Sequence, residues 1–170
     1  MTLEQLNRLE AAAARGALER CCGAARWVER VCGARPFPDR AALEAAAEGA
    51  FAGLERADWL EAFAHHPRIG DLASLCAKYA STAAWAGEEQ RGAAGAGEDT
   101  LAALAAGNRA YEDRFGYIFI VCATGKSADE MLSLLRARLP HSPEREMRIA
   151  AEEQMKITRL RLERLLEGGG

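Results

Sequence analysis

His66 is the residue whose setting in the sequence most suggests chemistry. It lies in the stretch HisHisProArgIleGlyAsp at residues 65–71, directly before Pro67 and shortly before Gly70. Proline disfavours helical backbone at the preceding residue and glycine permits a turn, so we expect the imidazole at a fixed corner where a helix ends. The alternative is a histidine that only interacts with the carbonyl end of that helix. Neighbouring helical side chains point about 100° apart, so His65 and His66 are not expected to share a metal ion.

Two further groups could bind a ligand or transfer protons. Glu88, Glu89 and Gln90 lie in a glycine-rich stretch, where carboxylates can move protons and an amide matches the edge of a urea group. Arg161 shares one helical face with apolar residues, and its guanidinium could hold a carboxylate through two parallel hydrogen bonds. The plainer alternatives are a solvated acidic surface and an arginine that reaches solvent. The predicted helical face comprises Met147, Ala150, Gln154, Ile157, Arg161 and Leu165.

The segment TyrIlePheIleValCysAla at residues 117–123 is apolar, aromatic and β-branched. No second run of this kind is present to pair with it as a strand, so we predict a fully buried helix that ends near Thr124. The end of such a helix offers free backbone groups to a ligand. Cys122 has no histidine or cation close to it in the sequence and is interpreted as a packing residue.

The composition limits the classes of protein that fit. A chain of 170 residues with a net charge of −3 fits one compact domain, and not a nucleic-acid-binding protein that needs a basic excess. No apolar run is long enough to cross a membrane, and the first residues lack the pattern of a signal peptide. The five cysteines are irregularly spaced, which predicts reduced thiols in a cytoplasmic protein and no structural zinc site.

Alanine occurs 37 times and β-branched residues are scarce, which predicts an all-α fold. We expect a single compact bundle of about eight to ten helices over residues 1–170. Thr2 with Gln5 should cap a first short helix, and two more helices are expected at about 11–22 and 24–32. Asp39 should cap a helix to about residue 54, and Asp58 should cap another that ends near residue 65.

Three further helices are expected in the C-terminal half besides the one over residues 117–123. One should begin at residue 99 or 100 and stop near Gly116. Ser127 and Glu130 form the pattern of a capping box for a helix to about residue 139. Ser142, followed by proline at the first helical position, should begin a long last helix to about residue 166.

These stretches together resemble the OHCU decarboxylase family, whose members decarboxylate 2-oxo-4-hydroxy-4-carboxy-5-ureidoimidazoline (OHCU). The resemblance covers nearly the whole chain and is most specific over residues 115–132. It rests on HisProArgIleGly at 66–70, GluGln at 89–90, PheGlyTyrIlePheIleValCysAlaThrGlyLysSer at 115–127, AlaAspGluMetLeu at 128–132, ArgLeuPro at 138–140 and LysIleThrArgLeuArgLeu at 156–162.

The resemblance implies an all-α homodimer that uses no cofactor or metal and converts this small molecule to (S)-allantoin and CO₂ in urate degradation. It makes His66, Glu89 and Arg161 the catalytic residues. The substrate-binding residues that it implies are Pro67, Ala86, Gln90, Phe119, Ile120, Val121, Cys122 and Ala123. Ala86 stands where the family often has a serine, which would remove one hydrogen bond to the substrate. The alternatives are another lyase or hydrolase of purine or ureide breakdown, and a non-enzymatic helical interaction module.

Overall fold

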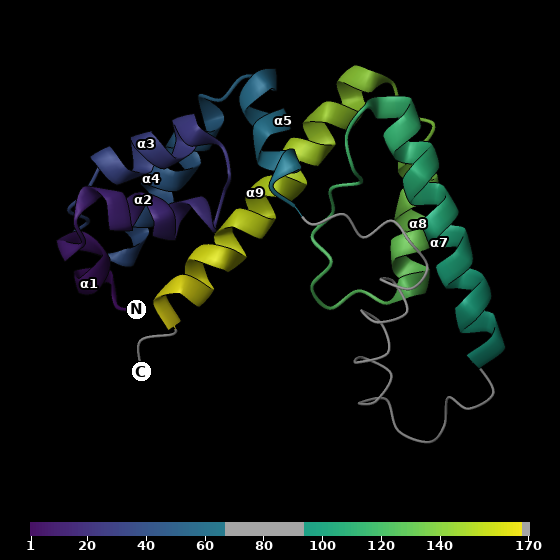
Figure 1. Cartoon of the computed structure of the whole chain (residues 1–170), viewed down its shortest axis with the longest axis horizontal. Coiled ribbons are helices and arrows are strands. Elements are labelled where there is room, and N and C mark those ends of the chain that lie inside the picture. Colours follow the sequence, from purple (N-terminus) through teal and green to yellow (C-terminus); the bar gives the residue numbers. More distant parts are fainter. Residues whose placement is uncertain (67–93, 168–170) are drawn as a thin grey trace. The chain divides into compact units, whose positions relative to one another are not determined.

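The structure is a computed structural model that describes residues 1–66 and 94–167. These residues form eight α-helices and no strand, which confirms the all-α prediction (Figure 1). The helices are α1 (Leu3–Arg8), α2 (Ala11–Glu19), α3 (Ala25–Gly33), α4 (Arg40–Ala52), α5 (Arg56–Ala64), α7 (Ala94–Phe115), α8 (Ala128–Arg138) and α9 (Pro143–Glu167).

Side-chain caps begin several helices where the sequence predicted them. The Thr2 hydroxyl accepts from the Gln5 backbone N–H, while the Gln5 amide oxygen accepts from the Thr2 N–H. Asp39 accepts a backbone N–H in the first turn of α4 at 2.8 Å. Ser127 and Glu130 form the same reciprocal pair at the start of α8. Each cap satisfies N–H groups that the helix itself leaves unpaired.

Two predicted helix starts are wrong. Asp58 lies inside the first turn of α5, because its carboxylate accepts from the N–H of Glu55, which precedes the helix, at 2.8 Å. α7 begins at Ala94, before the expected start at residue 99 or 100. The alanines before Glu98 are strong helix formers and extend the helix backwards in spite of the glycines among them.

Residues 117–123 are neither helix nor strand, so the predicted buried helix is wrong. Gly116 has a φ of +80°, in the left-handed region that glycine reaches without strain, and it ends α7 there. Aromatic and β-branched residues then favour extended backbone. The Cys122 N–H donates to the Glu153 carboxylate at 2.7 Å rather than to a helical carbonyl. Tyr117 and Ile120 are buried, whereas the residues between and after them are half-buried.

The chain divides into two compact units, each described by itself. The first unit contains residues 1–66, 120–122 and α9 from residue 147 onwards. Its core includes Trp27, whose indole N–H donates to the Ala47 carbonyl at 3.0 Å and so joins α3 to α4. Apolar side chains of α9 complete this core, which includes Leu6, Leu18, Trp27, Val31, Leu43, Ala47, Ala151, Met155 and Leu162.

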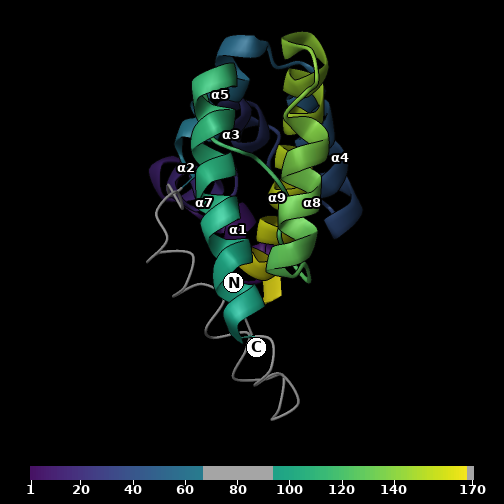
Figure 2. The same ribbon diagram turned by 90° about the vertical axis from the view of Figure 1, so that its right-hand side faces the viewer.

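The second unit contains residues 94–119 and 123–146 of the described chain. Figures 1 and 2 both show α7 and α8 side by side within it. Gly107 permits this close approach, because a Cβ atom at that position would lie 2.5 Å from Cδ2 of Leu135 on α8. The first turn of α9 also belongs to this unit and carries the buried Glu146.

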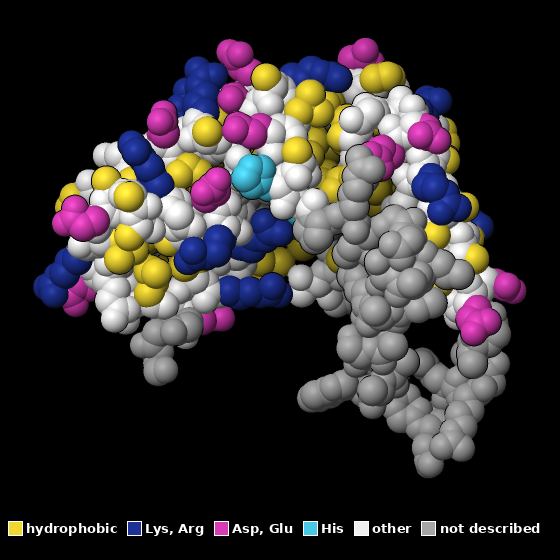
Figure 3. Space-filling view, in the orientation of Figure 1, with side chains coloured by type: hydrophobic (Ala, Val, Ile, Leu, Met, Phe, Trp, Pro, Cys, Tyr) yellow, Lys and Arg dark blue, Asp and Glu magenta, His cyan; other side chains and the backbone are white. Residues whose placement is uncertain are grey.

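The surface of the described chain carries charges of both signs. Figure 3 shows acidic and basic side chains interspersed over the described residues of one face, in keeping with the small net charge. Within the part of the chain that the structure describes, no helix is long and apolar enough to span a membrane. The four cysteines in this part, Cys21, Cys22, Cys32 and Cys122, are free thiols, as predicted.

Candidate active site

The backbone places His66 directly after α5, at the predicted helix end. The His66 N–H donates to the Phe63 carbonyl at 3.2 Å and closes the last turn. Gly23 allows the segment between α2 and α3 to lie against this corner, because a Cβ atom there would lie 2.1 Å from Cγ of His65. The corner is therefore held by packing as well as by the backbone.

Both ring nitrogens of His66 contact side chains of α9. Nε2 lies 2.6 Å from Oε1 of Gln154, and Nδ1 lies 3.4 Å from Nη2 of Arg161. Arg161 also donates through Nη1 to the Arg20 carbonyl at 3.4 Å. The structure thus brings together two predicted catalytic residues that are 95 residues apart in sequence. The alternative, in which His66 interacts only with the carbonyl end of its own helix, is wrong, because its imidazole ring contacts α9.

The surroundings of His66 favour the neutral imidazole. Burial lowers the pKa of His66 below its usual value near 6.5, and the positive charges of Arg161 and His65 lower it further. The hydrogen bond to Gln154 acts in the opposite direction. A neutral imidazole keeps one nitrogen lone pair, so His66 can accept a proton at neutral pH. The guanidinium beside it remains charged and can bind an anionic group.

Glu153 of α9 holds the predicted substrate-binding segment 120–122 within the first unit. Its Oε2 accepts the Cys122 N–H at 2.7 Å, and its Oε1 accepts from Nζ of Lys156 at 2.5 Å. Ile120 is buried, whereas Val121 and Cys122 are half-buried. The backbone N–H at position 122 already has a carboxylate partner, so α9 fixes the course of this segment.

The remaining predicted site residues lie in the second unit or outside the described residues. Phe119 and Ala123 belong to the second unit and are half-buried. The guanidinium carbon of Arg138 lies 4.6 Å from the ring centre of Phe119, which is cation–π geometry. The acidic cluster with Glu88 and four predicted site residues lie outside the described residues: Pro67, Ala86, Glu89 and Gln90.

A buried charged network supports Arg138 in the second unit. Glu146 is fully buried, and its Oε1 accepts from Nε of Arg138 at 2.7 Å and from the Tyr111 hydroxyl. Its Oε2 lies 3.0 Å from Nδ1 of His141. Burial and the bond to Glu146 raise the pKa of Tyr111, so its hydroxyl stays protonated and donates. The sequence alone predicts no role for this network.

The contacts of Gln154 with His66 and Thr158 are not predicted by the sequence. The sequence puts Gln154 on the apolar face of the last helix, and both Gln154 and Thr158 are fully buried. Nε2 of Gln154 donates to Oγ1 of Thr158 at 3.3 Å. The available signal was a polar, uncharged residue on an apolar helical face, because a buried amide must find hydrogen-bond partners.

The cysteines near Arg161 are poor candidates for nucleophiles. Burial raises the pKa of Cys21 to about 11 and also raises the pKa of Cys22. The reactive form of cysteine is the thiolate, which these surroundings disfavour. Among the described residues, no group of three histidine, cysteine or acidic side chains is placed to hold a metal ion.

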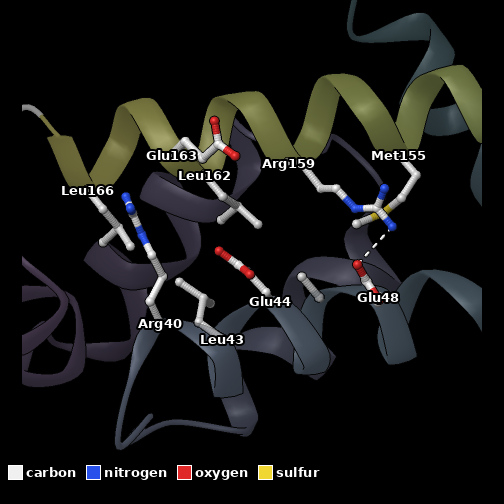
Figure 4. Close-up of a pocket in the computed structure, with 10 residues that line it drawn as sticks. Arg40, Leu43, Glu44, Glu48, Met155, Arg159, Leu162, Glu163 and Leu166 are labelled. Carbon is white, nitrogen blue, oxygen red and sulfur yellow. Dashed lines mark ion pairs between the residues drawn. The ribbon is translucent and has the colours of Figure 1, made fainter.

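A pocket lies elsewhere in the first unit, between α4 and α9 (Figure 4). Glu48 and Arg159 close one side of it with an ion pair of 2.8 Å. Leu43 and Leu162 provide part of its apolar lining. None of the predicted site residues lines it, so its position gives no support to chemistry there.

In this all-α fold, a half-buried histidine whose surroundings favour the neutral form lies beside an arginine. Such a site is suited to proton transfer on an anionic ligand. The family profile described as OHCU decarboxylase matches residues 7–163. The chain is 29% identical to 2-oxo-4-hydroxy-4-carboxy-5-ureidoimidazoline decarboxylase of Haloferax volcanii, over 95% of this chain and 94% of that protein. The chain belongs to the OHCU decarboxylase family.

Two further similarities concern a longer protein and a solved structure. The chain is 36% identical to the uric acid degradation bifunctional protein TTL of Arabidopsis thaliana over 85% of its own length, and it spans 45% of that protein. A crystal structure of OHCU decarboxylase in the presence of (S)-allantoin has a TM-score of 0.69 and 33% identity to this chain. The match covers 88% of this chain and 96% of the other.

Proposed function

We propose that this chain catalyses the stereospecific, cofactor-independent decarboxylation of OHCU to (S)-allantoin and CO₂, as one catalytic domain over residues 1–170. The observation that carries this proposal is the contact between His66 and Arg161, built by α5 and α9 on the scaffold of the family. The solved relative studied in the presence of (S)-allantoin supports the class of product. The protein acts as a homodimer in the cytoplasm.

The substrate can supply its own electron sink. Its carboxylate lies on a carbon that bears a hydroxyl and adjoins a C=N carbon. When the carbon–carboxylate bond breaks, CO₂ leaves and the electron pair forms a C=C bond, while the imine nitrogen takes a proton. The enol then loses its hydroxyl proton and gains a proton on the carbon that bears the ureido group. One proton is consumed per carboxylate, and the face that receives the carbon-bound proton fixes the handedness of allantoin.

The protein then has to orient the substrate, stabilise charge and place protons. His66 exchanges a proton with the ring hydroxyl, and Arg161 holds an anionic group or carbonyl oxygen. Glu89 orients His66 or delivers the proton to the ring carbon, and Gln90 binds the ureido group. The substrate-binding positions that complete this proposal are Pro67, Ala86, Phe119, Ile120, Val121, Cys122 and Ala123.

A coupled assay tests the proposal. OHCU is generated freshly from urate with urate oxidase and hydroxyisourate hydrolase, and the circular dichroism of (S)-allantoin is followed with and without the protein. We expect accumulation faster than the racemic background. His66→Asn should lower turnover by about 10²-fold or more, the usual contribution of a general acid–base group. His65→Asn, which changes the exposed neighbouring histidine, is the matched control and should retain turnover within a few-fold.

The pH profile gives a second check. Because burial lowers the pKa of His66, its neutral form persists below pH 6.5, and the acidic limb of turnover should lie below that value. Decay of OHCU at the background rate in the presence of folded protein would contradict the proposal and favour another reaction of purine or ureide breakdown. Near-normal turnover of His66→Asn would remove the catalytic role of His66.

A further inference from the structure

We propose that Gln154 is a positioning residue that fixes the tautomer of His66, so that Nε2 carries the proton and Nδ1 presents the basic lone pair beside Arg161. The inference rests on the proposed function for its catalytic consequence. The tautomer itself is a property of the free protein and can be measured without substrate.

The orientation of the Gln154 amide follows from the hydrogen bonds of Thr158. The Thr158 hydroxyl donates its one proton to the backbone carbonyl of Gln154 at 2.9 Å. Its oxygen can therefore only accept from the Gln154 side chain, which lies 3.3 Å away. The neighbouring Cys22 sulfur, which burial keeps protonated, is only a weak acceptor and competes poorly with the carbonyl for the Thr158 proton. The NH₂ group of Gln154 must face Thr158.

The carbonyl oxygen of the same amide then faces His66. It lies 2.6 Å from Nε2, and an oxygen without protons can only accept. Nε2 therefore bears the proton, and Nδ1 is the acceptor in the neutral ring. Nη2 of Arg161 lies 3.4 Å from Nδ1 and can only donate. The partners of both ring nitrogens thus require the same tautomer.

The amide of Gln154 is held in this one orientation because it is fully buried and water cannot satisfy its groups in any other. Gln154 and Thr158 each have 0% exposure, and reversing the amide would place its NH₂ group against the Nε2 proton and its oxygen towards a hydroxyl with no proton to give. A base whose lone pair points at the wrong partner cannot accept the substrate proton. The charged or titratable groups facing the ring from the described elements are Arg161 on α9 and His65 after α5.

The decisive experiment is long-range proton–nitrogen correlation NMR on the free protein, which distinguishes protonated from unprotonated ring nitrogens. The chain has three histidines, and His66→Asn assigns the resonances of His66 by their loss. We expect a dominant Nε2–H tautomer in the wild type. Thr158→Ser keeps the hydroxyl and should retain it, whereas Thr158→Val frees the amide and should give a mixture. A dominant Nδ1–H tautomer in the wild type would overturn the inference.

Substitutions of Gln154 test the same contact from the other side. Gln154→Glu places a carboxylate against Nε2 and should raise the pKa of His66 by about one unit or more, because an adjacent negative charge favours the imidazolium. Gln154→Met removes the acceptor at similar volume and should weaken the tautomer preference, which then depends on Arg161 alone. If Gln154→Met does not fold, Gln154→Glu and the Thr158 pair decide the matter. Unchanged tautomer ratios and pKa values across the folded variants would overturn the inference.

Turnover of OHCU separates this inference from the proposed function. Gln154→Met should lower kcat by about two- to fivefold with a smaller change in KM, because a smaller fraction of His66 holds the productive tautomer. Gln154→Glu should move the acidic limb of the kcat profile upwards. A wild type with the expected tautomer but no decarboxylation would refute the function and leave the tautomer assignment in place. A normal kcat in a folded Gln154→Met variant would contradict the positioning role of Gln154 in turnover.

Discussion

Glu146→Gln is expected to destabilise the second unit strongly. The Glu146 side chain has 0% exposure, and the Arg138 side chain that it pairs with has only 7%. The amide preserves volume but removes the negative charge that lies against the buried Arg138 guanidinium. Removing one partner of a buried ion pair typically costs about 3–5 kcal/mol. That is a large share of the roughly 5–15 kcal/mol that stabilises a typical domain.

The hydrogen bonds of Glu146 place this change at the upper part of that range. Its Oε1 accepts from Arg138 and from the Tyr111 hydroxyl, and its Oε2 lies 3.0 Å from Nδ1 of His141. A glutamine keeps one accepting oxygen and turns an NH₂ group towards one of these partners. Each buried donor left unsatisfied adds about 1–3 kcal/mol, although losses within one network are not additive.

Urea unfolding followed by far-ultraviolet circular dichroism measures the effect. The set comprises Glu146→Gln, Arg138→Met and the double variant Glu146→Leu with Arg138→Met. The double variant should lose less stability than the two charge-removing single variants do in sum, because it removes both members of the ion pair together. The exposed Asp113→Asn in the same unit is the control and should change the free energy of unfolding by about 0.5 kcal/mol or less. A loss below about 1 kcal/mol for Glu146→Gln would refute the reasoning.

Two further predictions concern the first unit. Gly23→Ala should lower kcat/KM, because its Cβ would lie 2.1 Å from Cγ of His65 and must displace the corner after α5. At Gly16, no described atom beyond its own helical turn lies within 4 Å of an added Cβ, so Gly16→Ala should leave kinetics unchanged. Equal kinetics of both variants would contradict this packing argument. Glu153→Ala should raise KM, because it removes the carboxylate that accepts the Cys122 N–H. Glu153→Gln retains an acceptor oxygen and should keep KM close to the wild-type value. An unchanged KM of Glu153→Ala in steady-state kinetics would count against this role.

The features that the sequence predicted well depend on neighbouring residues. The caps at Thr2, Asp39 and Ser127 each join groups three residues apart, so the local pattern contains the whole interaction. The end of α5 before residue 67 depends in the same way on the proline that follows it. Alanine-rich composition fixed the all-α class, because tertiary packing did not have to override the local preference.

The features that the sequence did not predict depend on residues far away in the sequence. The segment 117–123 was predicted as a helix because no strand partner was present, yet its Cys122 N–H is satisfied by Glu153, 31 residues later. The role of Gln154 was equally hidden, because its partner His66 is 88 residues away. Periodicity placed Gln154 and Arg161 on one face, but only the fold shows that the end of α5 meets that face.

The geometry of α9 explains how few elements are needed to build this arrangement. Gln154 and Arg161 are separated by two turns, so they lie on the same side of the helix and reach the two nitrogens of one imidazole. Thr158 lies between them, one turn after Gln154, and therefore sets the amide from within the same helix. The direction of the His66 lone pair then depends on a single rigid element together with the corner after α5. Substitutions that bend α9 between these turns should disturb His66 even where they touch neither ring nitrogen.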